Sequence, residues 1–287
     1  MKSYLSLVKF AHTVFALPFA LLGFFLATLE SGQGLSLRLF ALVLLCMVFA
    51  RSAAMGFNRY LDRDIDGQNP RTAQREIPSG VISPRSALFF VLANSLAFMI
   101  TTYFINDICF YLSPLALLIV LGYSYTKRFT ALCHFVLGLG LSLAPIGAYL
   151  AVVGHFAIIP LLYSLAVLLW VSGFDIIYAL QDDAFDRSLS LHSIPARLGR
   201  RGALRLSAVL HLVSALAILT ASYWQQQQYP AFGWLHWLAA AIFIGLLFYQ
   251  HTLVRPNDLS RVNLAFFTTN GVASLIFGAL VILDIFF

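Results

Sequence analysis

The sequence predicts an all-α integral membrane protein in which nine transmembrane helices surround a central cavity. Hydrophobic residues make up 60% of the 287-residue chain and charged residues only 10%, and the mean hydropathy is +0.85. Soluble globular domains are far more polar. Nine apolar runs come close to the ~20 residues that cross a bilayer as a helix. We place them at residues 10–29, 38–58, 86–105, 108–126, 131–153, 158–181, 203–223, 232–254 and 262–286.

These runs follow one another through short polar connections, so we treat residues 1–287 as a single transmembrane domain in the lipid bilayer. The three cysteines lie in or beside apolar runs and offer neither a metal-binding spacing nor a disulfide framework. The seven histidines share no repeated ligand spacing, and we expect them to pack between helices rather than to bind metal. No obligate protein partner is evident.

The second apolar run passes directly into the most charged part of the chain. Asn58, Asp62 and Asp66 recur there at every fourth residue. On a helix each step of four residues advances by about 40°, so the three side chains share one face. Asp64 points about 200° away from Asp62, and we expect it to be an exposed charge. Arg59 is rotated about 100° from Asn58, which predicts that it also lies off this face.

A similar pattern ends the sixth apolar run. Asp175, Tyr178, Asp182 and Asp186 fall within roughly 80° of arc on a continuous helix. Asp183 is offset from Asp182 by about 100°, and we expect it to be an exposed charge. The second acidic pattern therefore also presents one oxygen-rich face.

The two motifs contain seven of the twelve acidic residues in the chain. They end spans that are four helices apart, so both lie on the same side of the membrane. Each is followed by an Ile-Pro pair, at Pro78 and at Pro195. This arrangement predicts a parallel four-helix internal repeat that brings both acidic helix ends to one shared ligand.

The basic residues predict the orientation of the chain. If the spans alternate in direction, 16 of the 18 Lys and Arg residues fall on one side; the exceptions are Arg38, at the start of the second span, and Arg51, inside it. Short cytoplasmic loops accumulate basic residues. We therefore predict a protein of the cytoplasmic (inner) membrane with its amino terminus and both motif loops in the cytoplasm. The net charge of +6 reports this orientation and does not indicate a nucleic-acid partner.

Carboxylates that face one another at the end of a membrane helix are costly unless a cation lies between them. The motifs offer only oxygen ligands, which favours Mg²⁺, and Mg²⁺ completes its shell with substrate phosphates and water. Arg71, Arg75 and Lys127 lie close by in sequence or in the next cytoplasmic loop, and their side chains suit diphosphate oxygens. The pattern predicts a lipid diphosphate whose departing pyrophosphate is stabilised by metal and whose allylic cation is stabilised by aromatic rings.

Several segments resemble the UbiA superfamily of intramembrane aromatic prenyltransferases. They are the Asn58-x-x-x-Asp62-x-x-x-Asp66 motif with its continuation NPRTAQREIPSG, then SYTKR, PIGAYLAVVG, and YALQDDAFD followed by LHSIPARLG. The similarity covers nearly the whole chain and is strongest to the 4-hydroxybenzoate polyprenyltransferase-like branch of bacterial quinone biosynthesis. One departure is Arg59, which stands where many members have Asp.

The resemblance implies Mg²⁺-dependent transfer of a polyprenyl group from polyprenyl diphosphate to an aromatic acid such as 4-hydroxybenzoate, in ubiquinone or menaquinone biosynthesis. It implies that the diphosphate is bound by Arg71, Arg75 and Lys127. It also implies that two Mg²⁺ ions are held by Asn58, Asp62, Asp66, Asp182 and Asp186.

Two alternatives stay open at this point. A naphthoate acceptor of menaquinone biosynthesis also carries an acid and a phenol, and the sequence contains no direct measure of ring size. A secondary transporter is a more distant alternative, because transporters usually place their ion site near the midplane between inverted repeats. A structural membrane subunit would leave both motifs unexplained.

Three further residues are candidate substrate contacts. Arg51 precedes Asn58 by seven residues, which places it about 20° from the direction of Asn58 and roughly 10 Å deeper in the membrane. An arginine at that depth is costly unless it has a partner, so we predict that it holds the carboxylate of the acceptor. Asp175, deeper than the rest of its motif, is predicted to orient or deprotonate the acceptor, and Tyr178 to bond a phosphate or a carboxylate.

Overall fold

The structure, a computed structural model, describes residues 2–8 and 10–287. Within these residues the secondary structure is helical, apart from an isolated β-bridge between Arg255 and Asp258. In the described part of the chain nine helices are long and apolar enough to cross a membrane, which confirms the predicted fold class. In chain order the elements are α1 (Lys2–Val8), η1 (Phe10–Phe15), α2 (Leu17–Ser31), α3 (Leu37–Gln68), α4 (Pro84–Tyr103), α5 (Asp107–Thr126), α6 (Cys133–Val153), α7 (Ile158–Ala179), η2 (Leu180–Asp182), α8 (Asp183–Ser188), α9 (Ile194–Gln228), α10 (Leu235–Leu253), η3 (Leu264–Thr269) and α11 (Asn270–Leu283).

Short polar side chains determine where several of the spanning helices begin. Ser36, Ser83, Asn106 and Ser193 each accept a hydrogen bond from the backbone N–H three residues later. These side chains satisfy backbone donors that have no partner inside a helix. At the other end, α2 and α6 stop at glycines with positive φ, 62° at Gly32 and 70° at Gly154, a conformation that costs other residues more.

The core of the bundle lies around α7, which packs between α6 and α9. Large aromatic side chains fill it, and Trp170 lies 5.3 Å from Phe243 and 5.6 Å from Phe19 between ring centroids. In the outer helices, by contrast, many apolar side chains face away from the protein. Phe89 on α4 is 74% exposed, as expected for a helix that faces lipid rather than water.

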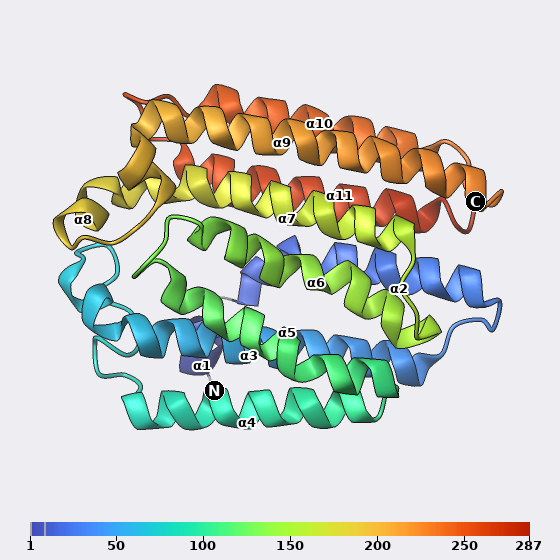
Figure 1. Ribbon diagram of the computed structural model, residues 1–287, viewed down its shortest axis with the longest axis horizontal. Coiled ribbons are helices and arrows are strands. Elements are labelled where there is room, and N and C mark those ends of the chain that lie inside the picture. Colours follow the sequence, from blue (N-terminus) through green and yellow to red (C-terminus); the bar gives the residue numbers. More distant parts are fainter. Residues whose placement is uncertain (1, 9) are drawn as a thin grey trace.

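The two motif helices, α3 and α7, end at the same end of the bundle (Figure 1). There the connection that follows α3 lies close to the short helix α8, while the carboxyl terminus lies at the opposite end. The two acidic motifs are therefore brought together by helices that run in the same direction, as expected from two spans four helices apart.

Candidate active site

A cavity of about 770 Å³ lies where α3 and α7 end. Its walls come from α3, α5, α6, α7, α8, the connection after α3 and the segment that contains η3. The cavity is lined by all eleven residues that the sequence singled out, namely Arg51, Asn58, Asp62, Asp66, Arg71, Arg75, Lys127, Asp175, Tyr178, Asp182 and Asp186. The structure therefore brings all eleven residues together around one cavity, and their chemical roles stay predictions.

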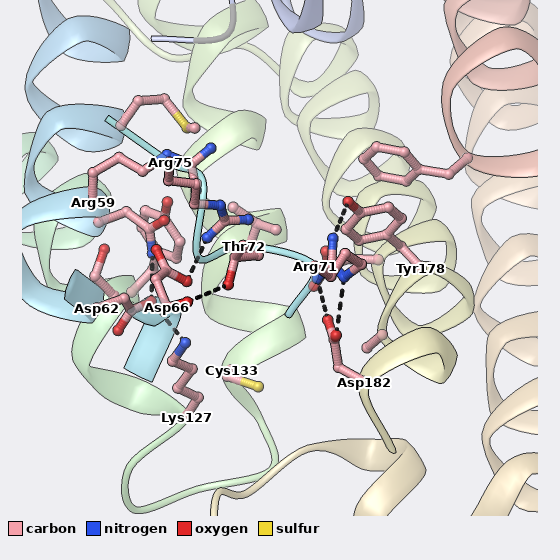
Figure 2. A pocket seen from close by; sticks show the side chains of 18 of the residues that line it. Arg59, Asp62, Asp66, Arg71, Thr72, Arg75, Lys127, Cys133, Tyr178 and Asp182 are labelled. Atoms are coloured by element: carbon pink, nitrogen blue, oxygen red, sulfur yellow. Dashed lines mark hydrogen bonds and ion pairs between the residues drawn. The ribbon is translucent and has the colours of Figure 1, made fainter. Parts of the chain in front are cut away.

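The first motif lies on the last three turns of α3 and is paired with basic side chains. Asp62 and Asp66 are only 2% and 4% exposed. Lys127 Nζ lies 2.7 Å from Asp62 Oδ2, and Arg75 Nη1 lies 2.6 Å from Asp66 Oδ1. Figure 2 shows both carboxylates facing these basic groups. Arg128 adds a second cation to Asp62, with 3.1 Å between Nη2 and Oδ1.

The connection after α3 joins the first motif to the second. Arg71 donates to both carboxylate oxygens of Asp182, at 3.1 Å from its Nε, and its Nη1 donates to the Tyr178 hydroxyl at 2.9 Å. Asn69 Nδ2 also donates to Asp182, at 3.2 Å. Burial alone would lower the pKa of the Arg71 guanidinium, but the bonds to Asp182 and Tyr178 raise the pKa above its ordinary value. Arg71 therefore stays charged and links the two halves of the site (Figure 2).

The second motif does not lie on one continuous α-helix, and that prediction was wrong. α7 ends at Ala179, residues 180–182 form a 3₁₀ turn, and α8 begins at Asp183. The 3₁₀ turn advances by about 120° per residue rather than 100°, which changes where the following side chains point. Asp182 and Asp186 nevertheless both line the cavity.

The expectation that Asp183 is an exposed charge was also wrong. Asp183 is 2% exposed and lies 2.9 Å and 3.1 Å from two nitrogens of Arg200 and 2.8 Å from Arg187 Nη2. A carboxylate can be buried when a guanidinium satisfies both its oxygens, so Asp183 fastens α8 to α9. Asp64, in contrast, has a side chain that is 78% exposed, as expected.

Arg59 lines the cavity, contrary to the expectation that it lies off the motif face. The chain after α3 folds back over this helix end, so the cavity extends around two sides of α3, and Figure 2 shows Arg59 near Arg75. Arg59 is 4% exposed, and its Nε is buried without a hydrogen-bond partner. Within the described residues no hydrogen bond or ion pair holds its guanidinium, which leaves a buried cation available to an anionic ligand.

The deeper part of the cavity is aromatic. Phe15, Phe174 and Phe266 surround it with centroid separations of 5.3 to 5.6 Å, and Phe266 stacks on Tyr178 at 4.1 Å. Phe266 belongs to η3, a π-helix, and such irregular turns occur often at functional sites. Arg51 lies at this depth on α3 and donates from Nη2 to the Val8 carbonyl at 3.3 Å.

His134 is a cavity residue that the sequence did not reveal. It is 3% exposed, and its Nδ1 lies 2.7 Å from Asp175 Oδ2. The two residues are 41 positions apart on different helices, and no spacing pattern connects them. A lone histidine near the start of an apolar run carries no signal of this contact.

The donor set of the first motif fits a hard divalent cation. Asn58 Nδ2 donates to Asp62 Oδ2 at 3.1 Å, so its amide oxygen is still available as a ligand. Asp66 Oδ2 and Asp62 Oδ1 are buried without a hydrogen bond, although Asp62 Oδ1 has the ion pair with Arg128. Among the described residues no three acidic, His or Cys side chains form a metal site by themselves. A metal here would need phosphate or water ligands, as Mg²⁺ sites generally do.

The chain matches a model of the UbiA prenyltransferase family over residues 16–272. Its curated relatives include a protein named 4-hydroxybenzoate octaprenyltransferase from Tolumonas auensis, 34% identical over 233 residues that make up 81% of this chain and 79% of the relative. A protein of the same name from Aeromonas hydrophila is 36% identical over 242 residues, with the same two coverages.

Solved structures show the same fold. The apo structure of a UbiA homolog from Aeropyrum pernix K1 matches with a TM-score of 0.83 and 34% identity, over 95% of this chain and 98% of the other. A UbiA homolog from Archaeoglobus fulgidus, bound to GPP and Mg²⁺, matches with a TM-score of 0.74 and 21% identity, over 99% of this chain and 100% of the other.

Replacing Arg59 by Met is expected to weaken the binding of inorganic pyrophosphate in the presence of Mg²⁺. The substitution keeps much of the side-chain volume but removes the buried cation, and a charge-assisted hydrogen bond contributes about 1.5–3 kcal/mol, or about 10- to 150-fold in Kd. Calorimetric titration of the purified protein measures this. Arg63→Met is the matched control, because Arg63 lies one turn further along α3 and pairs with the exposed Asp64. Equal affinities of Arg59→Met and wild type would show that Arg59 does not contact the anion.

Proposed function

This chain belongs to the UbiA prenyltransferase family, and from that premise we propose that it transfers a polyprenyl group from polyprenyl diphosphate to an aromatic acid of the 4-hydroxybenzoate class, with Mg²⁺ as cofactor. The main support is a single cavity whose mouth carries two acidic motifs and their basic partners and whose depth is aromatic. The names of the curated relatives support the aromatic acid. The prenyltransferase family favours the enzyme over the secondary transporter.

We assign the metal to the oxygens of Asn58, Asp62, Asp66, Asp182 and Asp186. When bound, Mg²⁺ supplies Lewis-acid stabilisation of the departing diphosphate. The three carboxylates Asp62, Asp66 and Asp182 are paired with Lys127, Arg75 and Arg71, which are the same side chains that we assign to the diphosphate. Binding of the substrate with its cation would let these side chains exchange partners: the carboxylates would hold the cation, and the basic groups would hold the phosphate oxygens.

The remaining steps are carried by side chains deeper in the cavity. The C1–O bond of the prenyl diphosphate breaks with its electron pair passing to the diphosphate, and a ring carbon of the acceptor forms the new bond to C1. Phe15, Phe174 and Phe266 present aromatic rings to the developing allylic cation and exclude water. Arg51 holds the acceptor carboxylate, and Asp175 accepts a proton from the acceptor.

Purified protein supplied with Mg²⁺, a prenyl diphosphate and 4-hydroxybenzoate is expected to release pyrophosphate and form the prenylated acid. Asp62→Ala and Asp182→Ala are expected to lower turnover by about 10²-fold or more, the usual effect of removing one positioned electrostatic group. Asp64→Ala, on the exposed side of the same helix, is the control and should keep its activity. Mass spectrometry of the products identifies the acceptor. Prenylation of a dihydroxynaphthoate in preference to 4-hydroxybenzoate would move the function to menaquinone biosynthesis, and full turnover by both variants in excess chelator would contradict the metal assignment.

Replacing Arg51 by Leu is expected to raise the KM for the aromatic acid and to leave the KM for the prenyl diphosphate nearly unchanged. Loss of a charge-assisted bond to the carboxylate corresponds to about 2–3 kcal/mol, or about 30- to 150-fold. Steady-state kinetics with each substrate varied in turn measures the two constants. A raised KM for the prenyl diphosphate alone would assign Arg51 to the other substrate.

We further propose that the connections after α3, α5 and α7 face the cytoplasm in the inner membrane. This orientation rests on the 16 of 18 basic residues that fall on one side. An alkaline phosphatase inserted near Gly80, in the connection between α3 and α4, is expected to be inactive, because the enzyme needs export. A fluorescent protein inserted at the same place should be bright. High phosphatase activity there would reverse the orientation and place the site outside the cytoplasm.

A further inference from the structure

His134 is held from two sides at the wall of the cavity. It is the second residue of α6, and its Nδ1 lies 2.7 Å from Asp175 Oδ2 on α7. Its Nε2 lies 3.3 Å from the backbone nitrogen of Ile194, the first residue of α9. The Ser172 hydroxyl also donates to the His134 carbonyl, at 3.2 Å. The imidazole therefore lies at the junction of three helices and cannot rotate without losing at least one bond.

The contact with Ile194 determines which nitrogen of a neutral His134 carries the proton. A backbone N–H can only donate, so Nε2 must accept and carries no hydrogen. Ile194 is in the first turn of α9, where backbone N–H groups have no acceptor inside the helix, so it needs one from elsewhere. The remaining ring proton is then on Nδ1 and points at Asp175. The backbone N–H at the start of α9 therefore selects the tautomer in which Nδ1 of His134 donates to the Asp175 carboxylate.

The bond to His134 occupies one oxygen of Asp175 and leaves the other able to accept. The Asp175 side chain is 21% exposed and lines the cavity at the depth of the aromatic wall. Within the described residues its only hydrogen bond is the one to His134. We propose that His134 and Asp175 form a dyad in which His134 is a positioning residue that fixes Asp175 to accept the hydroxyl proton of a phenolic acceptor. The dyad rests on the proposed function, because it needs an acceptor with an ionisable hydroxyl group.

The proton transfer balances within the overall reaction. The hydroxyl proton moves to Asp175 as the ring carbon attacks C1 and the diphosphate leaves with the C1–O electron pair. The ring carbon that formed the bond then loses its own hydrogen as a proton, and the oxygen is protonated again to restore the phenol. The net change is one prenyl diphosphate and one aromatic acid converted to the prenylated acid, diphosphate and one proton. No oxidant or reductant is required.

Two variants of His134 separate its two possible roles, which are to position Asp175 and to accept a hydrogen bond from the backbone N–H of Ile194. The amide group of asparagine falls near the Nδ1 position of histidine and that of glutamine near Nε2. His134→Asn keeps a donor for Asp175, whereas His134→Gln keeps an acceptor for Ile194. The dyad predicts that His134→Asn retains kcat within a few-fold of wild type. His134→Gln is expected to lose about 10- to 100-fold in kcat, part of the 10²–10⁴ that a positioned base typically contributes. The KM for prenyl diphosphate should not change in either.

Higher activity of His134→Gln than of His134→Asn, or wild-type kcat in both, would overturn the dyad. Thermal denaturation of the detergent-solubilised variants checks that each is folded.

Asp175→Asn is a further variant that keeps the dyad falsifiable if neither His134 variant folds. Its deficit in kcat should shrink on ring-fluorinated hydroxybenzoates, whose more acidic hydroxyl groups need less help to ionise. A deficit that is the same on every acceptor, or no deficit at all, would overturn the role of the dyad as a base. Failure of the wild-type protein to prenylate any phenolic acid would instead overturn the proposed function, so the two failures are distinguishable.

Discussion

The pairing of buried carboxylates with basic side chains at one end of the bundle is the interaction on which this structure depends. Asp62 and Asp66 are almost fully buried, and an uncompensated charge in such a place costs several kcal/mol. Arg75 and Arg71 come from one short connection, yet they pair with Asp66 and with Asp182 respectively. Ion pairs therefore fasten the connection after α3 to both motifs, and the connection forms part of the cavity wall between the two helix ends.

The same pairs explain how a site with many charges can exist before its substrate arrives. The cations that we assign to the diphosphate neutralise three of the carboxylates that we assign to the metal, Asp62, Asp66 and Asp182, so these groups have a partner in either state. A phosphorylated substrate with its cation brings both signs of charge. Each of these protein groups could therefore exchange its present ion-pair partner for an oppositely charged group of the ligand. Arg59 is different, since within the described residues no ion pair holds it, and an incoming anion would give it one.

The features that could be predicted from the sequence are those that follow from residue periodicity and composition. Nine apolar runs became nine spans in the described part of the chain, and a spacing of four residues correctly placed Asn58, Asp62 and Asp66 on one wall. Prediction from the sequence failed where the backbone departs from α-helical geometry and where a contact joins residues that are distant in the sequence. The 3₁₀ turn at residues 180–182 breaks the second helix, and the burial of Asp183 depends on Arg200 seventeen residues later. His134 meets Asp175 only because three helices converge, which no local pattern encodes.

The two halves of the chain contribute to the site at every depth. At the mouth, the carboxylates of α3 face those that follow α7, joined through Arg71. Below them, Arg51 projects from α3, whereas Asp175 projects from α7 with His134 behind it. A carboxylate bound by Arg51 and a hydroxyl group that reaches Asp175 would hold an aromatic ring between the two helices, beneath the diphosphate. The reacting carbon is then located by both helices at once. Because neither half would supply both of these proposed contacts, the parallel arrangement of α3 and α7 would determine the geometry of the proposed reaction as well as the charge of the site.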